Sequence, residues 1–121
     1  MMKPVRRLLQ ALGACALVMS AGAYAQPVKL INVFEVPAGQ EQAALQSWER
    51  AREFLARQPG YRGTKLHQSL SPQSRFQLIN IAEWESVRAF QDAVAAMEAA
   101  RLAPLPQGVS ASPALYRVVR D

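Results

Sequence analysis

The stretch FQLINIAEWESVRAF, residues 76–90, predicts a strand that runs directly into a helix. Its first half is rich in apolar residues, and Ser86 is a favourable residue to cap the helix that follows. Because side chains alternate along a strand, one face of it would carry Phe76, Leu78, Asn80, Ala82 and Trp84. A buried amide without a hydrogen-bond partner costs about 1–3 kcal/mol. Asn80 therefore leaves two interpretations of this face, a core or a pocket.

Proline and glycine divide the rest of the chain into further elements. The predicted strands are residues 28–36, 61–70, 75–84 and 114–119, and the predicted helices are residues 40–58 and 86–102. Pro59 and Gly60 end the first helix, and SPQS joins the two central strands as a hairpin. The order βαββαβ is that of a ferredoxin-like α+β fold with an antiparallel sheet and two helices on one face.

Two of the predicted strands have apolar side chains on both faces. One set would pack on the helices, and the other would leave an apolar patch of about a few hundred Å² in water, which monomers seldom expose. The second set comprises Ile31, Val33, Ile79 and Ile81. A second copy of the chain, laid sheet to sheet, would cover it, so the sequence predicts a homodimer.

The first 25 residues predict a secretory signal peptide. A basic segment is followed by an apolar run, residues 8–23, and by the small-x-small sequence AYA before Gln26. The run is shorter than the ~20 residues that a membrane span needs. LGAC, residues 12–15, resembles a bacterial lipobox and leaves lipidation of Cys15 as the alternative. The apolar run continues past Cys15, which favours cleavage after Ala25 and a periplasmic or secreted domain of residues 26–121.

The composition of that domain excludes several classes of function. Removing residues 1–25 leaves 11 basic and 9 acidic residues, with no basic stripe that would indicate nucleic-acid binding. The only cysteine, Cys15, leaves with the signal peptide, and His67 is the only histidine. We therefore expect no disulfide and no metal site, and a domain of this size must be stabilised by its core or by a partner.

Two segments carry a resemblance to a known family. INVFEVPAGQEQAALQSWERAREFLARQPGY, residues 31–61, together with LINIAEWESVRAF, residues 78–90, closely resembles the antibiotic biosynthesis monooxygenase family of dimeric α+β barrels. The resemblance extends from about Val28 to Val119. The family includes cofactor-free quinone-forming monooxygenases, haem-degrading oxygenases and quinol monooxygenases, with a pocket between the sheet and the helices of each subunit. It implies a monooxygenase that oxidises a small aromatic, quinol- or anthrone-like substrate with O₂ and without a cofactor.

The resemblance also implies a set of site residues. Similar Asn and Trp residues, at the spacing of Asn80 and Trp84, occur at the active site of the cofactor-free members. An uncharged amide can donate to a developing oxyanion, and an indole can stack on a flat ring. Asn32 matches the first-strand Asn of haem-degrading members, and we expect it to bind substrate with Phe34 and Phe90. His67 is the candidate general base, because histidine titrates near neutral pH.

Each of these residues also has a purely structural interpretation. Trp84 could be a core residue, Asn32 and Asn80 could bond to neighbouring backbone, and His67 could lie on a surface or an interface. The second candidate function is therefore a non-catalytic dimeric barrel that binds a small hydrophobic ligand, or haem.

Two departures from the family pattern bear on the chemistry. Haem-degrading members bind iron through a histidine on the second helix, and residues 86–102 contain none, which excludes haem ligation from that position. Phe90 stands about where the cofactor-free members have a tyrosine, so that phenolic proton donor is missing. Tyr61 or Tyr116 could replace it.

Overall fold

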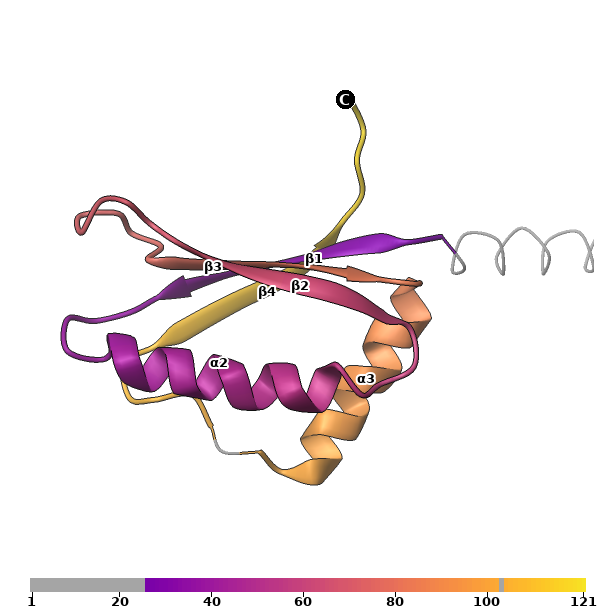
Figure 1. Cartoon of the computed structure of the whole chain (residues 1–121), viewed down its shortest axis with the longest axis horizontal. Helices are drawn as coiled ribbons and strands as arrows, with labels where there is room; N and C mark the ends of the chain where they lie inside the picture. Colours follow the sequence, from indigo (N-terminus) through magenta and orange to yellow (C-terminus); the bar gives the residue numbers. More distant parts are fainter. Residues whose placement is uncertain (1–25, 103) are drawn as a thin grey trace, which may run out of the picture.

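The protein folds as a four-stranded antiparallel sheet with both helices under one face (Figure 1). The computed structural model describes residues 26–102 and 104–121, so the predicted signal peptide and Cys15 lie outside the described residues. The elements are β1 (Val28–Glu35), α2 (Glu41–Leu55), β2 (Tyr61–Gln68), β3 (Leu78–Trp84), α3 (Val87–Ala100) and β4 (Ser110–Tyr116). The strand order β2-β3-β1-β4 is the predicted ferredoxin-like arrangement, which is confirmed.

The start of α3 is held by its cap and by the turn before β2. Ser86 Oγ accepts a hydrogen bond of 3.0 Å from the Ala89 N–H, as the sequence predicted for a cap. Gly60 has φ +89°, and a Cβ at this position would lie 2.4 Å from Ala89 Cβ. Only glycine therefore fits where the turn after α2 touches α3.

The core lies between the sheet and the helices in two apolar clusters. One contains Leu30, Ala82, Trp84 and Ala93. The other contains Phe34, Ala44, Leu78 and Val109. Each central strand contributes to both clusters, and the position between its two contributions is an asparagine, Asn32 in β1 and Asn80 in β3. The core is thus interrupted at the middle of the sheet.

The ends of two strands differ from the sequence prediction. β3 begins at Leu78, so Phe76 lies in the preceding loop, and β4 spans 110–116 instead of 114–119. β4 is an edge strand, the position in a sheet at which a proline such as Pro113 is tolerated. The loop before β3 is tied to β1 by Arg75, whose hydrogen bond to Glu35 lowers the pKa of that exposed carboxyl.

The face of the sheet without helices carries the second apolar set. Ile31 lies opposite Ile81 and Val33 opposite Ile79, on the face that the alternation predicted. Residues 117–121 leave the sheet on this side, as the rising tail in Figure 1 shows, with Val118 and Val119 exposed. Within the described ranges, neither helix has the length and apolar character to cross a membrane.

Candidate functional site

The centre of the helix-facing side of the sheet carries a pair of amides. Asn32 of β1 lies directly opposite Asn80 of β3 in the strand register. Asn80 is 8% exposed. The Asn32 side-chain oxygen is fully enclosed and has no hydrogen-bond partner among residues 26–102 and 104–121. A buried, unpaired acceptor costs free energy unless a ligand or water bonds to it, so this position has the character of a binding site.

The amide of Asn80 is held by the neighbouring strand. Thr64 Oγ1 donates a hydrogen bond to Asn80 Oδ1. Thr64 pairs with Ala82, so it is a diagonal neighbour of Asn80 on the same face of the sheet. Because an amide group is planar, the NH₂ of Asn80 then points away from Thr64. The side chain that sequence reasoning missed is therefore Thr64.

A β-bulge brings Thr64 to this face. The register of β2 against β3 shifts between Tyr61, opposite Trp84, and Gly63, opposite Glu83. Gly63 has φ +129°, which side-chain-bearing residues rarely adopt, and open space surrounds its Cβ position. Simple alternation puts Tyr61 and Thr64 on opposite faces, and the extra residue puts both on the helix side. A glycine inside a strand pattern was the available signal.

The bulge also determines the surroundings of Trp84. The Tyr61 ring meets the indole edge-on, with centroids 5.5 Å apart, and Phe90 does the same from α3 at 5.7 Å. Trp84 is only 1% exposed, and its Nε1 has no partner in the described part of the chain. Trp84 is thus a core residue in this conformation, with one unsatisfied donor.

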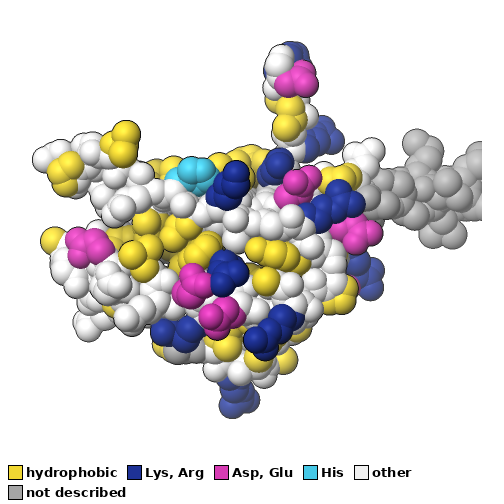
Figure 2. Space-filling view, in the orientation of Figure 1, with side chains coloured by type: hydrophobic (Ala, Val, Ile, Leu, Met, Phe, Trp, Pro, Cys, Tyr) yellow, Lys and Arg dark blue, Asp and Glu magenta, His cyan; other side chains and the backbone are white. Residues whose placement is uncertain are grey.

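The predicted base does not join this group. His67 lies opposite Ile79, so its side chain is on the face without helices. Its ring is exposed, and Nδ1 lies 3.2 Å from the Ile79 carbonyl oxygen. The one cyan side chain in Figure 2 is this histidine, at the edge of the sheet beside basic side chains. Alternation along β2 after the bulge puts His67 and Asn80 on opposite faces of the sheet, so His67 is not part of the proposed site.

The two predicted aromatic substrate contacts lie on opposite sides of the amide pair. Phe34 is 6% exposed in one apolar cluster, while Phe90 is half-buried against Trp84 in the other. The structure therefore brings Asn32, Asn80 and Thr64 together, with aromatic side chains in the clusters on either side.

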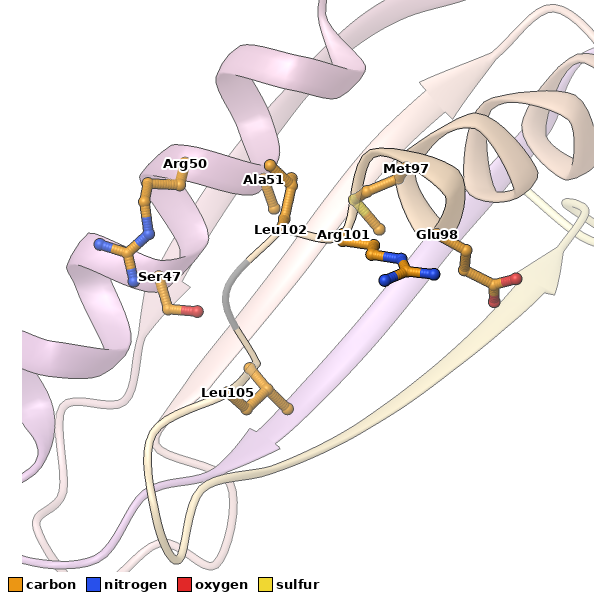
Figure 3. Close-up of a pocket in the computed structure, with 8 residues that line it drawn as sticks. All are labelled: Ser47, Arg50, Ala51, Met97, Glu98, Arg101, Leu102 and Leu105. Atoms are coloured by element: carbon orange, nitrogen blue, oxygen red, sulfur yellow. The ribbon is translucent and has the colours of Figure 1, made fainter.

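A cavity of about 260 Å³ opens between α2 and α3. Figure 3 shows its lining: Ser47, Arg50, Ala51, Met97, Glu98, Arg101, Leu102 and Leu105. Ser47 is 8% exposed, and β1 crosses behind the cavity in this view. Asn32, Asn80 and Trp84 do not line it, and Trp84 and Asn80 are themselves buried. Among the described residues, neither amide is hydrogen-bonded to backbone, which the structural interpretation required.

Comparison with known proteins places the chain in a family. The family model for antibiotic biosynthesis monooxygenases matches residues 27–103. The chain belongs to this antibiotic biosynthesis monooxygenase family. A candidate monooxygenase from Shewanella loihica PV-4 has a similar crystal structure, with 47% identity and a TM-score of 0.73 over 79% of this chain and 97% of that one. No protein of curated function matches the chain.

Two other family structures have described activities. SnoaB from Streptomyces nogalater, a cofactor-independent oxygenase, has 26% identity and a TM-score of 0.62, over 80% of this chain and 97% of that one. MhuD from Mycobacterium tuberculosis, a haem degrader with two haems in its active site, has 29% identity and a TM-score of 0.56, over 78% and 97%. These two similar structures thus differ in the chemistry described for them.

Proposed function

We propose that this protein is a cofactor-independent monooxygenase that oxidises a small aromatic, quinol- or anthrone-like substrate with O₂. The observation that carries the proposal is the buried amide pair Asn32–Asn80, which has an unpaired acceptor at the point where the two apolar clusters meet. Membership of the monooxygenase family and the likeness to SnoaB support the same chemistry.

The amides suit the charge that this reaction develops. Deprotonation of a phenol or anthrone gives an electron-rich anion, which passes an electron to O₂. For an anthrone, one oxygen atom becomes the new ring carbonyl and the other leaves in water with the two methylene hydrogens. The NH₂ of Asn80 would stabilise the oxyanion without itself titrating, and Asn32 Oδ1 would accept from a hydroxyl of the substrate. The apolar clusters would contact the ring faces.

We propose that substrate enters through the cavity between α2 and α3. The cavity lies on the helix-bearing side of the sheet. Its lining combines apolar side chains with Arg50 of α2 and with Glu98 and Arg101 at the end of α3. Ser47, the buried polar residue of this lining, would be the first group inside the entrance. Substrate binding then requires the helices to separate enough to uncover Asn32 and Asn80.

The residues do not fit a haem held by histidine. α3 contains no histidine, and His67, the only histidine of the chain, lies on the other face of the sheet. We therefore propose no haem chemistry for this chain, although MhuD is similar in fold.

A second function has one observation in its favour. Trp84 is 1% exposed between Tyr61 and Phe90, as expected for a barrel whose interior is filled by its own side chains. In that case the protein would catalyse no reaction, and a small hydrophobic ligand would bind in the cavity between α2 and α3.

We also propose that the protein is a homodimer. The apolar face formed by Ile31, Val33, Ile79 and Ile81 would be covered by the same face of a second copy, and Val118 and Val119 extend from that side of the sheet. A self-complementary contact of this kind is typical of two-fold dimers.

Oxygen uptake tests the catalytic proposal directly. The purified mature domain would be measured in an oxygen electrode against hydroquinones and anthrones, with and without a metal chelator. We expect uptake that depends on substrate, survives the chelator and falls about 10²-fold or more in Asn80→Ala. A wild type inert toward the whole panel, yet binding the same compounds by calorimetry, would establish the binding protein instead.

A further inference from the structure

We propose that Thr64 is a positioning residue that determines whether Asn80 presents a donor or an acceptor to the ligand. The inference rests on the proposed function, because it concerns the same amide. Thr64 is half-buried on β2 and is the only threonine of the chain. It has no counterpart among the residues that the family resemblance indicated.

The hydroxyl of Thr64 has one proton and two acceptors within reach. One is Asn80 Oδ1, at the shorter distance, and the other is the Ile81 carbonyl oxygen at 3.4 Å. A donor–acceptor distance of 3.4 Å is long for an O–H···O bond, whose usual range ends at about 3.0 Å. Thr64 therefore donates its proton to Asn80, and the Asn80 oxygen is the atom that faces Thr64.

The alternative arrangement would reverse the chemistry of the site. If Thr64 donated to Ile81, its oxygen would be free to accept from the Asn80 NH₂ group, and the amide would turn its oxygen to the ligand. An oxygen there would repel the developing oxyanion that a donor stabilises. The geometry of Thr64 thus selects the useful one of the two amide orientations.

The backbone holds Thr64 in place for this role. The β-bulge at Gly63 puts the side chain on the helix side of the sheet, and β-branching restricts its rotation about χ1. With Asn80 fixed in this way, the donor Asn80 Nδ2 is offered beside the unpaired acceptor Asn32 Oδ1. A phenolic hydroxyl, which both accepts and donates, complements this pair.

Two variants distinguish the effect of the Thr64 hydroxyl from the effect of the side-chain volume. Thr64→Val removes the hydroxyl and keeps the volume, while Thr64→Ser keeps the hydroxyl. We expect kcat to fall about 10-fold in Thr64→Val, as the loss of one oriented hydrogen bond implies, with KM little changed and Thr64→Ser near wild type. Thr64→Ala serves as the second hydroxyl-free variant if Thr64→Val does not fold.

A second measurement does not depend on turnover. The two side-chain NH₂ protons of Asn80 can be identified by NMR as the pair missing from Asn80→Ala. We expect both to shift and to exchange faster with water in Thr64→Val but not in Thr64→Ser. Unchanged resonances and a wild-type kcat in Thr64→Val would overturn the inference. If the wild type consumes no oxygen at all, the proposed function fails, and the resonances alone decide whether Thr64 orients Asn80.

Discussion

Asn32 lies directly opposite Asn80, yet only one of their two side-chain oxygens has a hydrogen-bond partner. Asn80 is held by Thr64, whereas Asn32 is held by no side chain or backbone group of the described residues. The difference predicts that the two positions, equivalent by strand register, respond in opposite ways to substitution.

At Asn80, loss of the amide should reduce turnover more than stability. Asn80→Ala removes the proposed oxyanion donor and should lower kcat about 10²-fold or more. Asn80→Asp is the matched control, because it keeps the shape and the acceptor for Thr64 but has no N–H to donate. Both rates should fall in the oxygen electrode, with a modest decrease in the melting temperature. Full activity in Asn80→Asp would contradict the donor role.

At Asn32, an apolar replacement should stabilise the empty protein. Asn32→Leu removes a buried acceptor that has no partner and should raise the free energy of unfolding by about 1 kcal/mol. Ligand binding should weaken at the same time, because the acceptor for the substrate hydroxyl is lost. Urea denaturation and calorimetry measure the two effects. Asn80→Leu, which leaves the Thr64 hydroxyl without its partner, should destabilise instead, and stabilisation by both changes would argue against the assigned contacts.

A single charge on the face of the sheet without helices should prevent formation of the proposed dimer. Ile79→Lys would put an ammonium group into the proposed dry interface, where the four apolar side chains contribute about 1.5–3 kcal/mol each before the costs of association. We expect a monomer or an insoluble chain by light scattering. Ile79→Leu, which keeps the apolar contact, should remain dimeric, and an unchanged dimer with lysine would show that another surface makes the contact.

Two glycine-to-alanine substitutions measure how much free energy the close contact between the turn and α3 would cost if a Cβ were added. Gly39 and Gly60 both have φ +89°, but only Gly60 faces a neighbour, Ala89. Gly39→Ala should cost about 1–2 kcal/mol from backbone strain alone, and Gly60→Ala about 2 kcal/mol more from the clash. Urea denaturation gives both values. Equal losses would mean that the turn moves away from α3 without cost.

Processing of the exported chain has a simple readout. We propose a periplasmic or secreted protein whose mature N-terminus is Gln26, because cleavage is expected after Ala25. The intact mass of the protein recovered from the periplasm should equal that of residues 26–121. A lipid-bearing species that begins at Cys15 would place the protein on a membrane anchor instead.

Periodicity was enough to predict the architecture, because the two faces of β1 and β3 follow from strict alternation. Leu30 and Phe34 face the helices and Ile31 and Val33 face away, as expected. The cap at Ser86 could also be predicted, because it depends only on neighbouring residues in the sequence. The limits of β4 could not be predicted, because a proline usually ends a strand. Pro113 is tolerated only because tertiary structure makes β4 an edge.

The site was less predictable because it depends on contacts between strands. Asn32 and Asn80 could be chosen from the sequence as polar residues on apolar faces, but their direct opposition needed the register. The partner of Asn80 could not be chosen, since alternation from Tyr61 assigns Thr64 to the wrong face. The packing of Trp84 could not be predicted either, because the bulge is what puts Tyr61 and Thr64 on the same face and Tyr61 against the indole.

The bulge at Gly63 also limits how residues can be matched between relatives along β2. A family member with a regular strand here would carry the residues before this point on the opposite face, although a residue-by-residue alignment would show no gap. Identity at such a position would then mean nothing about shared chemistry, and a side chain that reaches the interior in one protein would point to solvent in the other. For this strand, the conformation of one glycine determines which correspondences hold.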